Sequence, residues 1–119
     1  MKELVILIRP KKLEEVKKIL DDINCGGMTL STAMGCGTQK GVVADEEETV
    51  NEIRGLKTTI NLLPKVKVEV VVEDKDVERI IEKLRETCVT GHVGDGKIFI
   101  RNIEDVVRIR TGERGSKAL

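Results

Sequence analysis

The chain has almost no aromatic side chains and no net charge, and both absences argue against binding to nucleic acid. Phe99 is the only aromatic residue among 119, and 21 basic side chains balance 21 acidic ones. Proteins that bind single strands stack the bases on aromatic rings. A neutral chain also lacks the overall electrostatic field that attracts a polyanion. We therefore expect no nucleic-acid partner.

The chain also lacks long apolar runs and an even set of cysteines. Its longest apolar runs, such as residues 4–8, are far too short to span a bilayer, and we expect no signal peptide before them. An odd cysteine count without metal-ligand spacing argues against a disulfide framework or a metal site. We expect Cys25, Cys36 and Cys88 to be buried or half-buried free thiols. These features predict a single cytoplasmic domain with no direct membrane insertion.

Glycines are concentrated in residues 90–97, which run Thr-Gly-His-Val-Gly-Asp-Gly-Lys. Glycine lets backbone N–H groups approach an anion closely, because no β-carbon blocks the way. Arg108 and Arg110 follow at positions i and i+2 of a stretch predicted to be extended, so both guanidinium groups would point toward the same phosphate oxygens. We interpret these features as a polyphosphate site. The alternative is a glycine-rich hairpin that binds no ligand.

The glycine segment resembles a P-loop in spacing but not in context. Gly91, Gly96 and Lys97 fit the pattern, yet Ile98 stands where a P-loop needs a Ser or Thr hydroxyl for Mg2+. A P-loop also follows a strand and opens a helix. Here a helical stretch comes before the glycines and an apolar run comes after them. A kinase or ATPase of the P-loop type is therefore not favoured.

Two stretches of the chain repeat a strand–helix–strand pattern. Two such units predict an α+β fold of the ferredoxin-like type, with both helices on one face of an antiparallel sheet. Asp74 or Asp76 is expected to cap the second helix. The other sheet face would stay bare, so the domain should associate with copies of itself. The expected segments are strands at 3–9, 28–34, 66–72 and 97–101, a helix at 12–23, and a helix that carries Val77, Ile80, Ile81 and Leu84.

The segment between the two repeats, residues 35–63, has no strong periodicity. It contains several glycines and an acidic run at 45–48, which we interpret as a solvated stretch. Loops of this length are uncommon inside a compact domain and are usually functional or disordered. We therefore expect the segment to contact a partner or to respond to a ligand.

Together these pieces resemble the PII signal-transduction family of nitrogen-status sensors, over nearly the whole chain. The resemblance implies a homotrimer and a single domain over residues 1–119. Within it lie a long regulatory loop at about 37–62, a glycine loop at 89–97 and a C-terminal segment at 105–119. The residues that carry the resemblance are the opening 2–10, Gly27-Met-Thr29, Gly35-x-Gly37-x-Gln-Lys-Gly41, Leu63-Pro-Lys65 with 66–69, the block 90–99, and Arg108-Ile-Arg-Thr-Gly112.

The resemblance also implies the ligands and the residues that hold them. ATP or ADP would lie between subunits, with Arg108 and Arg110 reaching in from a neighbouring copy. Mg2+ would bridge the ATP phosphates, 2-oxoglutarate and Gln39, while Lys65 would pair with the distal carboxylate. The implied nucleotide-binding residues are Thr29, Gly35, Gly37, Thr38, Gln39, Glu69, Val71, Gly94, Asp95, Gly96, Lys97, Arg108 and Arg110; those for 2-oxoglutarate are Gly37, Gln39, Lys40, Gly41, Lys65 and Gly94.

The sequence departs from the family pattern in the long loop. The loop is several residues longer than in enteric-type members, and Thr58 stands where those members carry a uridylylated tyrosine. The chain has no tyrosine, so uridylylation of tyrosine is excluded. Thr38 replaces the usual arginine, which should weaken one phosphate contact. Arg54 aligns with the loop tip that enters an ammonium channel in some members, and it is our candidate for contact with a partner.

The function that the resemblance implies is a non-enzymatic sensor of nitrogen, carbon and energy status. It would regulate nitrogen-assimilation targets, such as an ammonium channel or glutamine synthetase, and a channel partner would recruit it to the inner membrane. One alternative is a weak ATP-hydrolysing enzyme, although His92 is the only histidine available as a base. Another is a trimeric ferredoxin-like module for a different small metabolite, against which the pair Gln39 and Lys65 argues.

Overall fold

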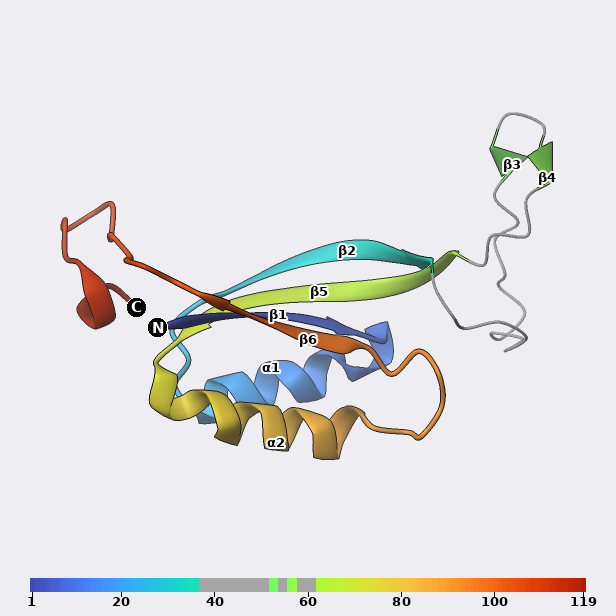
Figure 1. The fold of residues 1–119 in the computed structure, drawn as a ribbon, viewed down its shortest axis with the longest axis horizontal. Coiled ribbons are helices and arrows are strands. Elements are labelled where there is room, and N and C mark those ends of the chain that lie inside the picture. The colour runs from blue at the N-terminus through green and yellow to red at the C-terminus, as the bar shows by residue number, and fades with distance from the viewer. Residues whose placement is uncertain (37–51, 54–55, 58–61) are drawn as a thin grey trace.

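Four strands form one antiparallel sheet, and two helices cover one of its faces (Figure 1). The computed structural model describes residues 1–36, 52–53, 56–57 and 62–119. The sheet has the order β2–β5–β1–β6, which is the predicted α+β, ferredoxin-like arrangement. The main elements are β1 (Lys2–Ile8), α1 (Leu13–Asp22), β2 (Met28–Cys36), β5 (Leu62–Val72), α2 (Val77–Cys88) and β6 (Lys97–Asn102).

Short elements complete the described part of the chain. Three 3-10 helices, η1 (Pro10–Lys12), η2 (Asp74–Asp76) and η3 (Gly115–Ala118), stand before α1, before α2 and near the end of the sequence. Between β2 and β5, β3 (Glu52–Ile53) and β4 (Leu56–Lys57) pair with each other in a separate two-stranded sheet. The strands β2 and β5 extend beyond their predicted limits toward this intervening segment.

The core lies between the helices and one face of the sheet because apolar residues alternate along the strands. On β5, every second residue from Val66 to Val72 is buried, and the residues between them face the other way. From β1, Leu4, Ile6 and Ile8 join this layer. The helices complete it at 3–4-residue spacing, with Val16 and Leu20 from α1 and Val77, Ile80, Leu84 and Cys88 from α2.

The cysteines differ in their environments. Cys88 is buried in the core and Cys25 is half-buried, as expected, and burial raises the pKa of both thiols. Cys36 is exposed at the end of β2, so the expectation of burial is wrong for this residue. It is the last residue of β2, two residues beyond the predicted end of this strand.

The start of α2 also differs from the prediction. Asp76 is the N-cap residue, but its carboxylate makes no capping hydrogen bond and instead accepts one from Arg79 at 3.0 Å. Asp74 lies 3.0 Å from the amino group of Met1. Both carboxylates therefore pair with cations, and the predicted side-chain cap is absent at this helix. A preceding 3-10 turn, η2, supplies the entry into the helix instead.

Among the residues that the structure describes, no helix covers the second sheet face, as predicted, and both edge strands expose apolar side chains. Leu30 and Met34 are 41% and 53% exposed on β2, and Phe99 and Ile100 are 47% and 50% exposed on β6. Unpaired edges that carry apolar residues are surfaces on which another chain can pack. The fold therefore leaves two different edges available for contact with a partner.

Truncation of a buried helix residue should cost far more stability than truncation of an exposed one. Ile80→Ala removes a fully buried side chain and should lower the free energy of unfolding by about 2–5 kcal/mol. The matched change Ile109→Ala, at a fully exposed residue, should stay within about 0.5 kcal/mol. Urea unfolding followed by circular dichroism measures both, and equal losses would mean that the helix packs differently.

Candidate functional site

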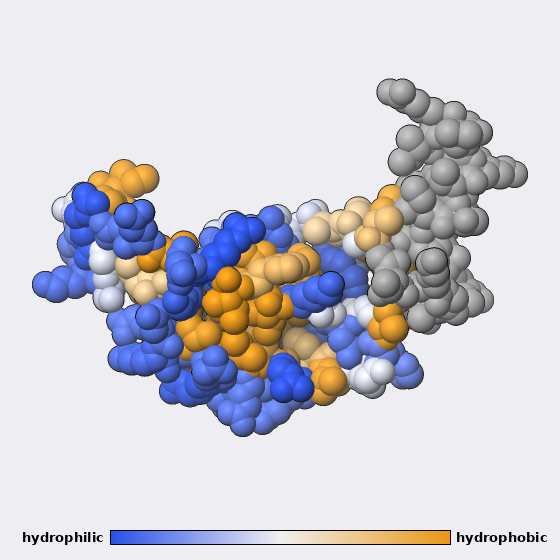
Figure 2. Space-filling view, in the orientation of Figure 1, coloured by the Kyte–Doolittle hydropathy of each residue, from blue (hydrophilic) through white to orange (hydrophobic). Residues whose placement is uncertain are grey.

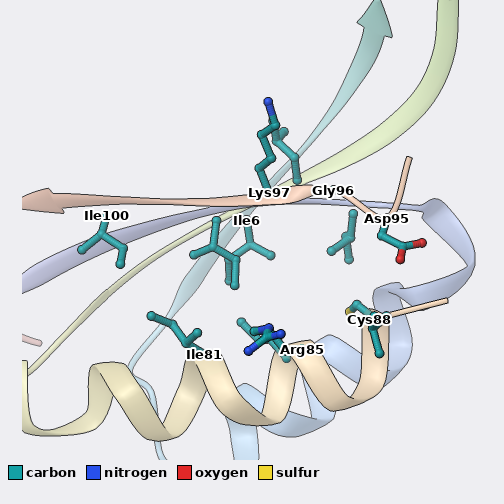
Figure 3. Close-up of a pocket in the computed structure, with 13 residues that line it drawn as sticks. Ile6, Ile81, Arg85, Cys88, Asp95, Gly96, Lys97 and Ile100 are labelled. Atoms are coloured by element: carbon teal, nitrogen blue, oxygen red, sulfur yellow. The ribbon is translucent and has the colours of Figure 1, made fainter. Parts of the chain in front are cut away.

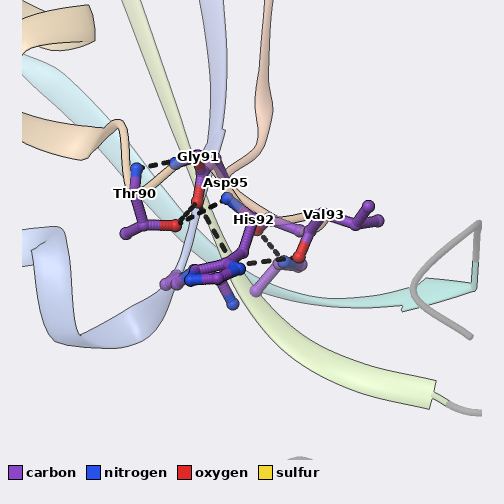
Figure 4. A network of polar contacts seen from close by, with 8 residues as sticks. Thr90, Gly91, His92, Val93 and Asp95 are labelled. Atoms are coloured by element: carbon purple, nitrogen blue, oxygen red, sulfur yellow. Dashed lines mark hydrogen bonds and ion pairs between the residues drawn. The ribbon is translucent and has the colours of Figure 1, made fainter. Parts of the chain in front are cut away.

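The loop that joins α2 to β6 is organised by the carboxylate of Asp95 (Figure 4). This carboxylate accepts hydrogen bonds from the backbone N–H groups of Thr90 and Gly91, at 2.8 and 3.1 Å, and from the Thr90 hydroxyl. Arg9 approaches it from the end of β1, with Nη2 at 3.2 Å from an Asp95 oxygen. The four donors close residues 90–95 into a compact turn.

The same contacts change the acidity of Asp95. Burial favours the neutral acid, but the hydrogen bonds from Thr90, Arg9 and Gly91 favour the carboxylate and together hold the pKa of Asp95 far below its usual range. Asp95 is therefore ionised at neutral pH. Its oxygens are engaged within the loop, so a contribution of this residue to anion binding would come from its backbone N–H.

Gly96 brings the loop close to the backbone of β1. Its φ is +112°, and a β-carbon added there would lie 1.8 Å from the carbonyl oxygen of Leu7. Only glycine fits such an approach. Gly91 and Gly94 also have positive φ values, of 84° and 102°. The glycines thus allow both the tight turn and the close approach to β1 by which the chain enters β6.

Arg9 is the site residue for which sequence reasoning gave no role. Besides Asp95, its Nη2 donates to the carbonyl oxygen of Val93 at 3.0 Å. Within the described part of the chain, Arg9 Nε is buried and has no hydrogen-bond partner. The position of Arg9 in the sequence could have indicated this role. Arg9 follows β1, the strand that pairs with β6, so the Arg9 side chain lies beside the loop that leads into β6.

Lys65 joins the glycine loop from β5. Its Nζ donates to the carbonyl oxygen of Gly94 at 2.5 Å. Burial and then the charge of Arg9 lower the pKa of Lys65, and the charge of Asp95 partly opposes this. Gly35 lies beside it, since a β-carbon added at Gly35 would be 3.3 Å from Lys65 Cγ. The structure thus brings Gly35, Lys65 and residues 94–97 together, and we call this group with Arg9 the glycine-loop half-site.

The C-terminal segment differs from the predicted extended stretch. Arg108 and Arg110 lie in a turn, in which the N–H of Gly112 donates to the carbonyl of Arg108 and the N–H of Arg108 donates to that of Glu113. The prediction that their side chains point the same way from a strand is therefore wrong. Glycine at 112, with a φ of 72°, lets the chain reverse here.

Three of the residues predicted to bind the nucleotide line one cleft. Thr29 on β2 pairs with Glu69 on β5, and Val71 follows on the same face. The cleft has a volume of about 250 Å³. Its remaining walls are Glu3, Gly26, Gly27, Val70, Ala118 and Leu119, and we call it the C-terminal cleft because the last two residues of the sequence close it.

The glycine loop and the C-terminal segment lie at opposite ends of the sheet (Figure 1). Lys97 begins β6, and Arg108 comes after its last residue, Asn102. Five steps of about 3.3 Å place the ends of this strand roughly 17 Å apart. A triphosphate is much shorter than that distance. One protomer therefore cannot bring its glycine loop and its C-terminal arginines to the same phosphate chain.

An apolar groove runs between α2 and β6 (Figure 3). Ile81 and Cys88 on the helix face Ile6 and Ile100 across it, while Lys97 points away from the helix. The groove has a volume of about 400 Å³ and forms part of the hydrophobic surface in the middle of Figure 2. It follows the edge of the sheet next to the glycine loop, so the two features share one side of the molecule.

The other predicted site residues lie outside the described residues. They belong to the segment between β2 and β5 and are Gly37, Thr38, Gln39, Lys40, Gly41 and Arg54. Their assignments to nucleotide, Mg2+, 2-oxoglutarate and a partner stay predictions.

The sequence is similar to one group of known proteins over its full length. It matches the family model described as nitrogen regulatory protein P-II over residues 1–113. It is 48% identical to nitrogen regulatory protein P-II 2 of Methanothermobacter thermautotrophicus over 119 residues, which cover 100% of this chain and 97% of the relative. The P-II proteins of Rhizobium meliloti and Azospirillum brasilense are 44% and 45% identical, over the full length of both chains. The likeness therefore spans both ends of the candidate site.

Removal of the charge at Asp95 should destabilise the fold most at neutral pH and less in acid. The folded-state pKa of Asp95 lies below its ordinary value of about 4. The carboxylate therefore stabilises the fold above about pH 4, and this stabilisation is lost as the pH falls through the folded-state pKa. Asp95→Asn should lower the free energy of unfolding at pH 7 by about 1–3 kcal/mol, with a smaller difference at pH 3. Urea unfolding at both pH values measures this, with Asp22→Asn as an exposed control.

Gly96 and Gly91 form a matched pair for testing the close approach to β1. Both have positive φ, but a β-carbon at Gly91 would meet nothing within 4 Å. Gly91→Ala should cost only the backbone strain of about 1–3 kcal/mol. Gly96→Ala adds a collision with Leu7 and should cost about 3 kcal/mol or more. Similar thermal unfolding temperatures for the two variants would contradict the described path into β6.

Proposed function

The chain belongs to the nitrogen regulatory protein P-II family, and on this premise we propose that it is a non-enzymatic sensor of ATP or ADP, Mg2+ and 2-oxoglutarate. Family membership makes it a regulator of nitrogen signalling that acts on target proteins. The observation that supports the ligand proposal is that the residues predicted to bind phosphate lie at two opposite ends of one protomer. A nucleotide between two copies would join those halves.

The glycine-loop half-site has the chemistry that a polyphosphate needs. Gly94 and Gly96 leave the backbone open to an anion, and the exposed side chain of Lys97 follows at once. Arg9 and Lys65 add two cations beneath the loop, and the buried Nε of Arg9 is a donor without a partner among the described residues. Guanidinium and ammonium groups of this kind suit phosphate oxygens. These features support binding of the nucleotide phosphates here.

The two exposed edges support a ring of copies. The groove along β6 and α2 is one apolar surface, and Leu30 and Met34 on β2 are part of a different one. When one edge packs against a different edge of the next copy, the contact repeats from copy to copy and forms a closed ring where the rotation between copies closes. We propose the homotrimer that the family resemblance implies. In that ring each seam would receive a glycine loop from one copy and Arg108 with Arg110 from the next.

The contact between Lys65 and Gly94 supports a neighbouring site for 2-oxoglutarate. Both residues belong to the predicted set, and the Lys65 ammonium already donates to the Gly94 carbonyl. A carboxylate would be a stronger acceptor for this half-buried cation than a neutral carbonyl is. Mg2+ readily takes phosphate oxygens and few protein groups. We propose that it is held by the ATP phosphates and Gln39, and that Lys40 and backbone at Gly37 and Gly41 help to bind the effector.

The segment between β2 and β5 would carry the signal to the target. It starts and ends at the glycine-loop half-site, since Gly35 pairs with Leu63 and Lys65 lies two residues further along β5. A ligand that binds the two conformations of this segment unequally, by about 1–3 kcal/mol, changes target binding roughly 5- to 150-fold. The proposed targets are an ammonium channel, contacted through Arg54 and reached at the inner membrane, or glutamine synthetase. Among the described residues, no helix is long and apolar enough to cross a membrane.

Two other functions give different results in simple assays. A weak ATP-hydrolysing enzyme would show steady turnover of ATP, for which the exposed His92 is the available base. A binding module for another metabolite would show no response to 2-oxoglutarate. Turnover above trace rates, or an unchanged nucleotide affinity on addition of 2-oxoglutarate, would favour one of these over the sensor.

Loss of a C-terminal arginine should weaken nucleotide binding more than loss of a lysine in the long loop. Arg110→Ala removes a predicted phosphate contact, so the dissociation constant for ATP should rise about 10- to 100-fold, as expected for a hydrogen bond to a charged group. Lys40→Ala should change it less than about threefold, because its predicted role is in 2-oxoglutarate binding. Calorimetry on protein shown by sedimentation to be a trimer measures both. Equal losses, or sedimentation as lone monomers, would contradict the seam between copies.

Binding of 2-oxoglutarate should require Mg2+ and ATP together. Heat should appear when 2-oxoglutarate is added to protein with Mg-ATP, and none with ATP plus EDTA, because the metal links the two ligands. Gln39→Ala should remove this heat while ATP still binds. A Gln39→Ala protein that binds 2-oxoglutarate normally would rule out the proposed Mg2+ bridge.

A further inference from the structure

The last residues of the sequence fold back onto the protomer and engage Arg108. Nη2 of Arg108 donates to the carbonyl oxygen of Lys117 at 3.2 Å and to a backbone oxygen of Leu119 at 3.1 Å. Leu119 then lies against Gly26, where an added β-carbon would be 2.9 Å from the Leu119 carbonyl carbon. Residues 116–119, which we call the tail, thus connect Arg108 with the C-terminal cleft.

The direction of the tail is set by a separate cluster at Asp105. Its carboxylate accepts hydrogen bonds from Nε of Arg114 at 2.8 Å, from the N–H of Val106 at 2.8 Å and from the N–H of Gly115 at 3.1 Å. Gly115 also donates to the carbonyl of Val106 at 3.0 Å. These bonds close residues 105–115 into a loop, so the chain leaves Gly115 already aimed at the cleft.

The tail contacts two parts of the protomer that the nucleotide would need, the Arg108 side chain and the C-terminal cleft. It uses the guanidinium group predicted to bind phosphate, and Ala118 and Leu119 form a wall of the cleft that contains Thr29 and Glu69. A guanidinium group has a limited number of donors in a fixed plane. While Nη2 faces the backbone oxygens of the tail, Arg108 cannot turn the same donors toward a phosphate in a seam with another copy.

We propose that residues 116–119 are an internal competitor of the nucleotide: they hold Arg108 and close the C-terminal cleft until the nucleotide displaces them. The proposal rests on the proposed function, because it concerns the regulation of that nucleotide site. A segment attached only a few residues from Arg108 has a high effective concentration there, so weak bonds suffice to keep it docked. The observed nucleotide affinity is then reduced by the fraction of protomers whose tail is released.

Removal of the tail should therefore tighten nucleotide binding. A chain that ends at Gly115 should bind ATP about 3- to 10-fold more tightly than the full chain, as expected if roughly 70–90% of tails are docked. In an Arg108→Ala background the same truncation should change the affinity less than about twofold, because the shared group is gone. Lys117→Ala is the matched control, since the tail bonds to Arg108 through the carbonyl of this residue, and it should bind ATP like the full chain.

Two outcomes of the calorimetry would overturn the proposal. If truncation weakens binding in both backgrounds, the tail is part of the nucleotide site rather than its competitor. If truncation leaves the affinity unchanged, the tail does not compete. Absence of ATP binding by both the full and the truncated chain would refute the proposed function itself, and the competition with it.

Hydrogen exchange measures tail docking separately from nucleotide affinity. In the full chain, Arg108→Ala should speed hydrogen exchange at the Leu119 amide, which donates to Ser116 in the docked tail. Gly26→Ala should do the same, because its β-carbon would displace the tail without removing a residue. In the unsubstituted chain, saturating ATP should also speed this exchange. Slower exchange in the presence of ATP would overturn the proposal, because it would mean that the nucleotide binds against a docked tail.

Discussion

A single ionised carboxylate, that of Asp95, determines the shape of the glycine loop. Two backbone N–H groups, the Thr90 hydroxyl and Arg9 converge on it. Because Asp95 takes these donors, the loop has a fixed conformation in which Gly96 can pass against Leu7. A preformed loop loses less conformational entropy when it binds an anion than a disordered one does. The acidic residue therefore serves binding indirectly, by holding the loop that surrounds the anion.

The fold separates the parts of the candidate site more than the sequence suggests. The glycine loop and the C-terminal arginines are only about a dozen residues apart along the chain, but β6 places them at opposite ends of the sheet (Figure 1). These two segments could therefore bind one phosphate chain only in an assembly, in which the ends of different copies meet. Both edges of the sheet carry the apolar residues that such contacts require.

Sequence patterns predicted most of the fold, because alternation and helical spacing report directly which side faces the core. The four strands of the main sheet and both helices lie where the sequence predicted them, for example the strand with alternating apolar residues from Val66 to Val72. What failed was local: Asp76 pairs with Arg79 instead of capping α2, and Arg108 lies in a turn closed by Gly112. The contact of Arg9 with Asp95 was not predicted, because it joins residues 86 apart in sequence. The approach of Lys65 to Gly94 came only from the family resemblance, since no period in the sequence encodes it.

The length of β5 has a mechanical consequence. This one strand carries Lys65, which contacts the glycine loop, and Glu69 and Val71, which line the C-terminal cleft. In the proposed ring these two regions would face different neighbours. A stiff, fully paired strand transmits displacement along its length instead of absorbing it, so a shift at one junction of the ring would be felt at the next. In such an assembly the binding sites would be coupled, so a ligand at one junction could change the affinity for a ligand at another without direct contact.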